Sequence, residues 1–276
     1  MLIGASQPFG VSRKLSYTMS AERYTGRVLY VTFRTETDLS RWLPPPLVPA
    51  DPHEGFVKVY QLKRRPEHGD PLPPNFSQYN EVCVTVLAAP PGEPARHYNL
   101  FMWVDRDWAL YKAREAFGWP KKLADIHITD TFPSDDRYDL DEGTAQYDAD
   151  MSRWGYRVMS VRAELDPTAP AQPAPPFNGF YTARHIPAPI GGQPVSELLV
   201  IETRDGWFRP GVYGTAEIEF FDAPDEELSL LGPVEVTGCV LREVGWVLPG
   251  WPARRWGDLE TFDAQVGDEI TTKENA

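Results

Sequence analysis

Two adjacent lysines, Lys121 and Lys122, follow the aromatic–proline pair Trp119-Pro120, and this is the segment of the chain best suited to chemistry. A lysine amine attacks a ketone only after it has lost its proton, and a free amine with a pKa of about 10.4 is almost fully protonated at neutral pH. Burial among apolar groups and a neighbouring positive charge both favour the neutral amine. Trp119 can supply the apolar surface and Lys122 the second charge for a neutral Lys121, although a pair of lysines by itself is more typical of a solvated surface.

The residues before the lysines predict a rigid support. Apolar positions recur at helical spacing over residues 108–117, and Gly118 is typical of a helix end. Pro120 then prevents the helix from continuing and restricts the backbone just before Lys121. A nucleophile that follows such a break has a fixed position.

Strand patterns dominate the rest of the chain. Residues 28–33, 81–87 and 234–241 are rich in β-branched and aromatic side chains. Residues 155–162 also predict a strand, although their alternation does not identify the core face. A second, short helix is expected over residues 38–43, capped by Thr37 or Asp38.

The lysine segment resembles the active-site segment of the acetoacetate decarboxylase family, because Arg114-Glu115, the aromatic and proline before the lysines and the leucine after them keep that family's spacing. Tyr79-Asn80-Glu81 is similar to the Tyr-x-Glu motif of the family. In acetoacetate decarboxylase the active lysine, beside a second cation, forms a Schiff base with the ketone, and the resemblance gives that role to Lys121. Further similar segments are residues 29–38, 43–47, 98–105, 194–198, 218–222 and 247–249.

The resemblance also implies a fold and an assembly. It predicts a mainly β (α+β) fold, a closed cone-shaped antiparallel β-barrel with flanking sheets and a few short helices, in a homo-oligomer. Residues 168–177 are rich in alanine and proline and predict a stiff connector. Because segments on both sides match one family, we predict a single domain over residues 1–266, followed by a polar, disordered tail over residues 267–276.

Two positions depart from the family pattern. The family's decarboxylases have an Arg-Glu pair before the opening strand, and this pair falls on Gly26 and Arg27. A second family glutamate falls on Tyr60. A one-residue shift turns a strand side chain to the other face, so Arg27 replaces the arginine only if the register differs. Acetoacetate itself is therefore in doubt as the substrate.

The expected site joins the family motifs to these substitutions. Lys121 is the nucleophile, Glu81 transfers protons, and Lys122 favours the neutral amine or is only a surface neighbour. Tyr60, Arg27 and Trp119 are the expected substrate-binding residues, and Lys58 is a further candidate for a carboxylate contact.

Bulk composition excludes several other classes. The net charge of −13 repels phosphate backbones and argues against nucleic-acid binding. No apolar run is long enough for a transmembrane helix, and no signal peptide is evident. The two cysteines predict no disulfide framework, which favours a reducing, cytoplasmic setting. The histidines lack metal-ligand spacing and phosphate-loop motifs are missing, so we expect no metal and no cofactor.

The sequence therefore predicts a lyase that acts on a β-keto (oxo) acid through a lysine Schiff base, most simply a decarboxylase of an acid other than acetoacetate. One alternative is an aldolase-dehydratase that uses the same Schiff base on pyruvate or a related oxo acid plus an aldehyde. Another is a non-catalytic barrel that binds a small ligand.

Overall fold

The computed structural model describes residues 21–129, 145–188, 192–252 and 254–258, so the predicted polar tail lies outside the described residues. The strands are β1 (Glu22–Thr35), β2 (Val48–Pro49), β3 (Glu54–Pro66), β4 (Gln78–Ala89), β5 (Arg96–Val104), β6 (Lys121–Leu123), β7 (Asp125–Thr129), β8 (Ala145–Arg153), β9 (Tyr156–Asp166), β10 (Phe180–Ile186), β11 (Val195–Ile201), β12 (Arg204–Phe208), β13 (Val212–Phe220), β14 (Val234–Leu248) and β15 (Arg254–Asp258). The helices are η1 (Leu39–Trp42), α1 (Pro74–Ser77), α2 (Trp108–Phe117) and η3 (Leu228–Leu231).

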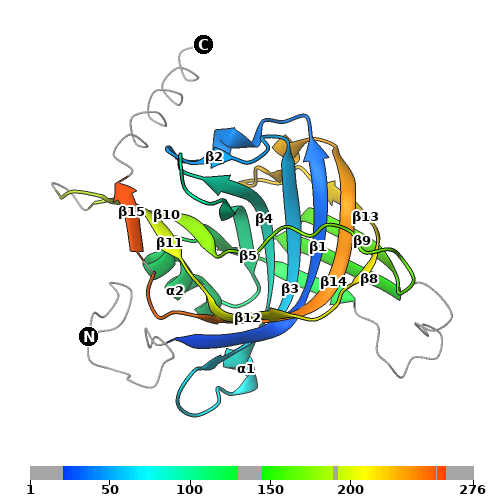
Figure 1. The fold of residues 1–276 in the computed structure, drawn as a ribbon, viewed down its shortest axis with the longest axis horizontal. Coiled ribbons are helices and arrows are strands. Elements are labelled where there is room, and N and C mark those ends of the chain that lie inside the picture. Colours follow the sequence, from blue (N-terminus) through cyan, green and yellow to red (C-terminus); the bar gives the residue numbers. More distant parts are fainter. Residues whose placement is uncertain (1–20, 130–144, 189–191, 253, 259–276) are drawn as a thin grey trace.

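All of these strands belong to one curved sheet (Figure 1). Its order is β15-β11-β10-β5-β4-β3-β1-β14-β13-β9-β8-β7. Outside this order, β2 pairs with β4, β6 pairs with β5, and β12 pairs with β14. β1, β3, β4 and β14 are the longest strands and form its middle. The mainly β class predicted from the sequence is confirmed.

The sheet is mixed, which corrects the expectation of a purely antiparallel one. β5 pairs in parallel with β6 and, over two positions, with β10. The physical reason lies in the connection, because α2 carries the chain back past β5, and a helical crossover makes the next strand parallel. Closure of the sheet into a cone stays a prediction, since the described path of pairings ends at β15 and β7.

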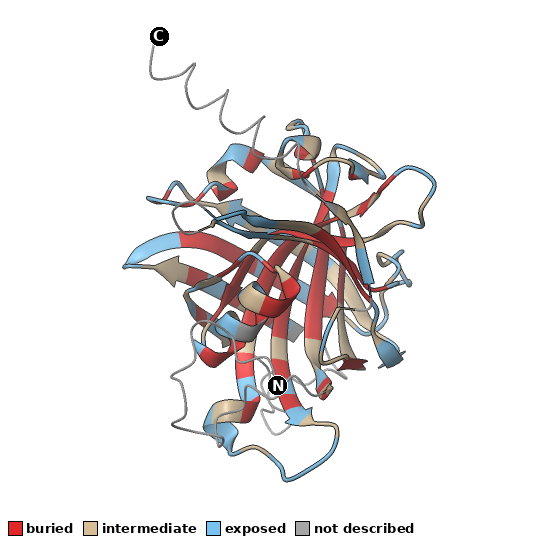
Figure 2. Ribbon diagram, turned by 90° about the vertical axis from the view of Figure 1, so that its left-hand side faces the viewer, coloured by how far each residue is buried: buried red, intermediate tan, exposed pale blue. Residues whose placement is uncertain are grey.

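The central strands are buried on both faces. Along β1, Leu29 and Val31 belong to one apolar cluster, whereas Val28 and Tyr30 belong to a second cluster on the opposite face. Successive strand side chains point to opposite sides, so one strand can serve two cores. Figure 2 shows the buried residues gathered along the middle of the strands, with exposed ones at their ends. The second cluster is the one that includes α2.

The helix predictions agree with the structure. α2 has the bounds expected from the sequence, and Gly118 ends it in the left-handed conformation, with φ 71°. The short helix after β1 is a 3-10 turn whose cap is Asp38, since its carboxylate accepts from the backbone N–H of Ser40 at 2.9 Å. The sequence analysis did not identify α1, a single turn that begins at Pro74.

Residues 168–177 follow β9 as a connector without regular structure up to β10. Within it, the Gln172 side chain bridges two elements, accepting from the backbone N–H of Cys239 and donating to the carbonyl of Gly214. In the part of the chain that the structure describes, no helix has the length and apolar character needed to cross a membrane.

Gly118 offers a test of how the end of α2 packs against β10. An added Cβ would lie 2.8 Å from the carbonyl oxygen of Ala183, in addition to the cost of a positive φ. We expect Gly118→Ala to lower the free energy of unfolding by about 2 kcal/mol or more in urea denaturation. The control is Gly92→Ala, where φ is also positive but nothing lies within 4 Å, so only the backbone cost of about 1 kcal/mol applies. Equal losses for the two variants would refute the close packing at Gly118.

Candidate active site

Lys121 begins β6, and the strand geometry turns its side chain into the molecule. It lies beside Met102 of β5, which belongs to the aromatic cluster around α2. Because strand side chains alternate, Lys121 and Lys122 face opposite sides. Lys121 is 4% exposed, whereas the Lys122 side chain is 33% exposed. The predicted nucleophile is therefore the buried lysine of the pair.

An ion pair joins Lys121 to Glu81 of β4. Nζ donates to Oε2 at 2.5 Å, and both side chains are buried. The other carboxylate oxygen accepts from the thiol of Cys83 at 3.5 Å. The amine also lies 5.6 Å from the ring centres of Tyr79 and Trp119. A charge-assisted hydrogen bond this short puts the carboxylate within direct proton-transfer reach of the amine.

The backbone of Lys121 is fixed from the side of α2. The N–H of Trp119 donates to the carbonyl of Ala113 at 3.1 Å, and the N–H of Lys121 donates to the carbonyl of Trp119 at 2.8 Å. The Arg114 guanidinium donates to the carbonyl of Lys121 at 2.8 Å. The motif arginine is therefore an anchor for the lysine backbone, which suits a nucleophile that needs one position.

Lys122 lies outside the pocket that Lys121 enters. Its amine donates to the carboxylate of Glu226 at 3.2 Å and to the backbone carbonyl of Asp225 at 2.8 Å. The Glu226 side chain is fully buried and also pairs with Arg153. The charge of Lys122 is thus matched by a carboxylate on the other side of β6, and the structure does not bring this lysine to the site.

The second cation inside the pocket is Lys58 of β3. It is 1% exposed and lines the same pocket as Lys121. Burial lowers the pKa of Lys58, and the positive charge of Lys121 lowers it further, while the Cys83 and Glu81 side chains act in the opposite direction. The like charge that the sequence analysis sought beside the nucleophile is therefore on β3.

Tyr60 stands beside Glu81 in the β3–β4 register and lines the pocket. Its ring meets that of Trp246 edge to face, with centroids 6.1 Å apart. Burial raises the pKa of Tyr60 well above its usual value, so the phenol stays protonated at neutral pH. At the position of the family's second glutamate, the pocket thus holds a neutral hydrogen-bonding group.

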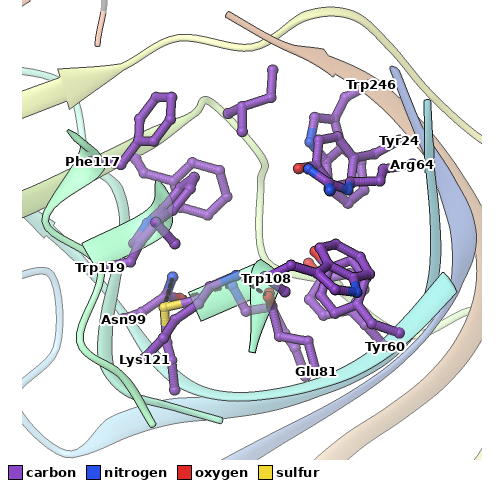
Figure 3. Close-up of a pocket in the computed structure, with 17 residues that line it drawn as sticks. Tyr24, Tyr60, Arg64, Glu81, Asn99, Trp108, Phe117, Trp119, Lys121 and Trp246 are labelled. Atoms are coloured by element: carbon purple, nitrogen blue, oxygen red, sulfur yellow. Dashed lines mark hydrogen bonds and ion pairs between the residues drawn. The ribbon is translucent and has the colours of Figure 1, made fainter. Parts of the chain in front are cut away.

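The walls of the pocket are aromatic. Eight of its seventeen lining residues are Tyr, Trp or Phe. Phe117 stacks on Trp119 with centroids 5.1 Å apart, and Tyr24 stacks on Trp246 at 5.5 Å. Figure 3 shows these two pairs on either side of an open centre, with Lys121 and Glu81 at its floor. Such a lining suits a flat or apolar reactant.

Arg64 lies across the pocket from the Lys121–Glu81 pair (Figure 3). Its Nη1 donates to Glu22 at 2.8 Å, its Nε donates to the carbonyl of Phe76, and its Cζ lies 4.0 Å from the ring centre of Trp108. Its Nη2 is buried and has no hydrogen-bond partner among the described residues. Arg64 therefore forms the end of the pocket opposite Lys121.

Arg27 is not among the residues that line this pocket. On β1 it alternates with Val28, whose face carries the pocket residue Tyr24, so Arg27 belongs to the opposite face. The position of the family arginine is Gly26, where an added Cβ would lie 2.1 Å from the backbone oxygen of Gln61. β1 and β3 approach too closely there for any side chain, so the arginine is not replaced from β1.

The structure brings Lys121, Glu81, Tyr60 and Trp119 into one pocket. It adds Arg64, which the sequence analysis missed, and Lys58, which was only a secondary candidate. The sequence did contain a signal for Lys58 and Arg64. Both share the even-numbered face of one strand with Tyr60, which was an expected pocket residue. Within the described residues no group of three His, Cys, Asp or Glu side chains can hold a metal ion, and both cysteines are buried and free.

A buried lysine paired with a carboxylate, in an aromatic pocket on a mixed sheet, agrees with the resemblance that the sequence motifs carry. Residues 6–253 match the acetoacetate decarboxylase (ADC) family, and the chain belongs to that family. A search of curated proteins found no match.

Several solved structures are similar to this chain. An acetoacetate decarboxylase-like enzyme from Sphingomonas wittichii RW1 is 24% identical with a TM-score of 0.80, covering 90% of this chain and 99% of that one. The enduracididine biosynthesis enzyme MppR complexed with pyruvate is 24% identical with a TM-score of 0.75, covering 93% and 98%. Acetoacetate decarboxylase from Legionella pneumophila is 16% identical with a TM-score of 0.68, covering 92% and 94%. These likenesses establish the fold.

The placement of Lys122 predicts that it does not tune the nucleophile. We expect Lys122→Met to leave the pH dependence of covalent labelling at Lys121 unchanged, because the lost charge faced Glu226 instead of the pocket. Stability should fall by about 1 kcal/mol in thermal or urea unfolding, since one partner of a partly buried ion pair is removed. A rise of about one unit in the labelling midpoint would contradict this placement.

Proposed function

We propose that this protein is a carbon–carbon lyase that acts on a small oxo acid through a Schiff base on Lys121, with Glu81 as the proton carrier. The observation that carries the proposal is the buried contact of 2.5 Å between the amine and the carboxylate. An amine nucleophile needs a nearby base to remove its proton and a nearby acid to release water from the adduct. One carboxylate at this distance performs both tasks in turn.

Imine formation follows from this geometry. Glu81 accepts a proton from the Lys121 ammonium, and the free amine attacks the carbonyl carbon of the substrate. The attacking nitrogen gives up a proton and the carbonyl oxygen takes it up, which yields a neutral carbinolamine while Glu81 stays protonated. Glu81 then returns its proton to the departing hydroxyl, water leaves, and a protonated imine remains on Lys121. The aromatic walls limit competing hydrolysis by excluding bulk water.

The protonated imine withdraws electrons from the adjacent carbon, and two outcomes use this property. In decarboxylation, the bond to a β-carboxylate breaks, CO2 leaves, and the electron pair forms an enamine. Protonation of the enamine carbon and hydrolysis then release the ketone and regenerate Lys121. Membership of the acetoacetate decarboxylase family supports this outcome.

In the condensation outcome, the adjacent carbon loses a proton to Glu81 and the resulting enamine attacks an aldehyde. A new carbon–carbon bond forms, the aldehyde oxygen takes up a proton, and dehydration and hydrolysis release an unsaturated oxo acid. The composition of the pocket supports this outcome, because aromatic side chains line it between Lys121 and Arg64 and suit a flat second reactant. A related structure, MppR, is complexed with the condensation product of pyruvate and imidazole 4-carboxaldehyde.

Borohydride trapping tests the proposal directly. Incubation with pyruvate or with acetoacetate, followed by reduction and peptide mapping by mass spectrometry, should yield an adduct on Lys121. Lys121→Met should give no adduct. Lys122→Met should still be labelled on Lys121, because Lys122 lies outside the pocket. An adduct on another lysine alone, or none with either acid, would rule the proposed chemistry out. Release of CO2 from acetoacetate, compared with consumption of pyruvate plus an aldehyde, separates the two outcomes.

The proton-carrying role of Glu81 predicts a kinetic defect. Glu81→Gln keeps the side-chain shape but cannot accept a proton, so the rate of imine formation should fall by about 100-fold or more. Stopped-flow or timed trapping measures this rate, and thermal unfolding checks that the variant is folded. Glu219→Gln, on the exposed face of β13, is the matched control and should be unaffected. A normal rate in Glu81→Gln would assign the proton transfer to another group.

A further inference from the structure

Lys58 is a buried cation that the Schiff-base chemistry does not use. It lies in the middle of β3, between Tyr30 of β1 and Cys83 of β4 in the register, and lines the pocket together with Lys121. Lysine side chains are rarely buried unless they are paired with an opposite charge. The contacts of this amine therefore call for an explanation.

The amine has one polar partner, and that partner is neutral. Nζ donates to Oδ1 of Asn99 at 3.0 Å. Around it stand the rings of Phe56, Tyr60 and Phe180, whose centres lie 5.4–5.8 Å from Nζ. Among the described residues, no carboxylate forms an ion pair with Lys58. An ammonium group has three donors, so two of them have no acceptor among the residues that the structure describes.

Asn99 presents a fixed oxygen to this amine. Its Oδ1 also accepts from the hydroxyl of Thr85 at 2.7 Å, and its Nδ2 donates to the sulfur of Met102 at 3.2 Å. Both ends of the amide are therefore held, and Lys58 is oriented without being neutralised. An arrangement that fixes an amine and leaves its charge unmatched is suited to an anion that arrives with the ligand.

Lys58 and Lys121 also repel one another across the pocket. A carboxylate placed between the two amines would relieve this repulsion and replace the hydration that burial has removed. Glu81 already pairs with Lys121, so the unmatched charge belongs to Lys58. A ligand with a single carboxylate next to its reactive carbonyl fits this charge balance.

We propose that Lys58 binds the carboxylate of the oxo acid while Lys121 holds its carbonyl carbon. The inference rests on the proposed function and goes further, since it names a substrate-binding residue and the class of substrate, a short monocarboxylic oxo acid. Loss of CO2 requires the negative charge of the carboxylate to move into the new enamine. An ion pair with Lys58 stabilises the charge where it starts, so it slows decarboxylation and favours condensation with retention of the carboxylate.

Trapping with a matched pair of ketones tests the role of the charge. Pyruvate and methyl pyruvate share the reactive carbonyl, but only pyruvate has a carboxylate. In Lys58→Met, the pyruvate concentration for half-maximal trapping on Lys121 should rise by about 10–100-fold, while that for methyl pyruvate stays within about threefold. Lys58→Arg keeps the charge and should keep most of the preference for pyruvate. Lys63→Met, at an exposed position of the same strand, is the control and should behave as the unmodified protein.

A second variant avoids removing the buried lysine. Asn99→Asp is nearly isosteric and supplies an internal carboxylate at the 3.0 Å position, so it should weaken trapping of pyruvate but not of methyl pyruvate. Equal effects on both ketones in Lys58→Met and Asn99→Asp would overturn the inference, because a residue that only tunes Lys121 affects any carbonyl.

A binding measurement separates this inference from the proposed chemistry. Lys121→Met cannot form an imine, yet pyruvate should still quench the fluorescence of the pocket tryptophans, and adding Lys58→Met should abolish the effect. One result is that pyruvate binds Lys121→Met through Lys58 but borohydride never traps an adduct on the unmodified protein. This result would support the carboxylate site and contradict the Schiff-base function. The opposite result is an adduct on Lys121 of the unmodified protein, with pyruvate binding that does not depend on Lys58. This result would support the Schiff-base function and contradict the carboxylate site.

Discussion

The burial of charged side chains in the pocket is the constraint on which this structure depends. Two amines and one carboxylate, from Lys58, Lys121 and Glu81, share an aromatic pocket in which bulk solvent screens little. The Lys121 amine is paired with this carboxylate, whereas the Lys58 amine donates only to a neutral amide oxygen and its charge is unmatched. The remaining positive charge gives the pocket a local sign opposite to the chain's net charge of −13, which an acidic protein needs if it is to admit an acid.

The sheet supplies this arrangement through its period of two. Tyr24 on β1, Lys58 and Tyr60 on β3, and Glu81 on β4 all reach one face because neighbouring strands keep their register over long stretches. The same alternation sends the intervening residues into the other apolar cluster. The site is therefore part of the fold's packing, and its residues are as fixed in position as core residues.

The sequence predicted the parts that depend on local pattern. The mainly β class, helix α2 with its Gly118 end and the burial of Lys121 follow from periodicity, turn chemistry and the family motifs. The partner of Lys122 and the place of Lys58 in the pocket depend on which strands adjoin, and local pattern does not contain long-range pairing. The parallel β5–β6 pair was missed because a strand of three residues has too few side chains to show alternation.

The close approach of β1 and β3 at Gly26 also bears on how this chain relates to the decarboxylases of its family. An arginine cannot return there by a single substitution, since even its first side-chain carbon would collide with the backbone of the neighbouring strand. Backbone collisions are relieved only when a strand shifts, and such a shift in mid-sheet would disturb many residues at once. The pairing of β1 with β3 therefore leaves this point of β1 without a side chain, and the cations of the pocket come from β3 and β6, as Lys58, Arg64 and Lys121 do.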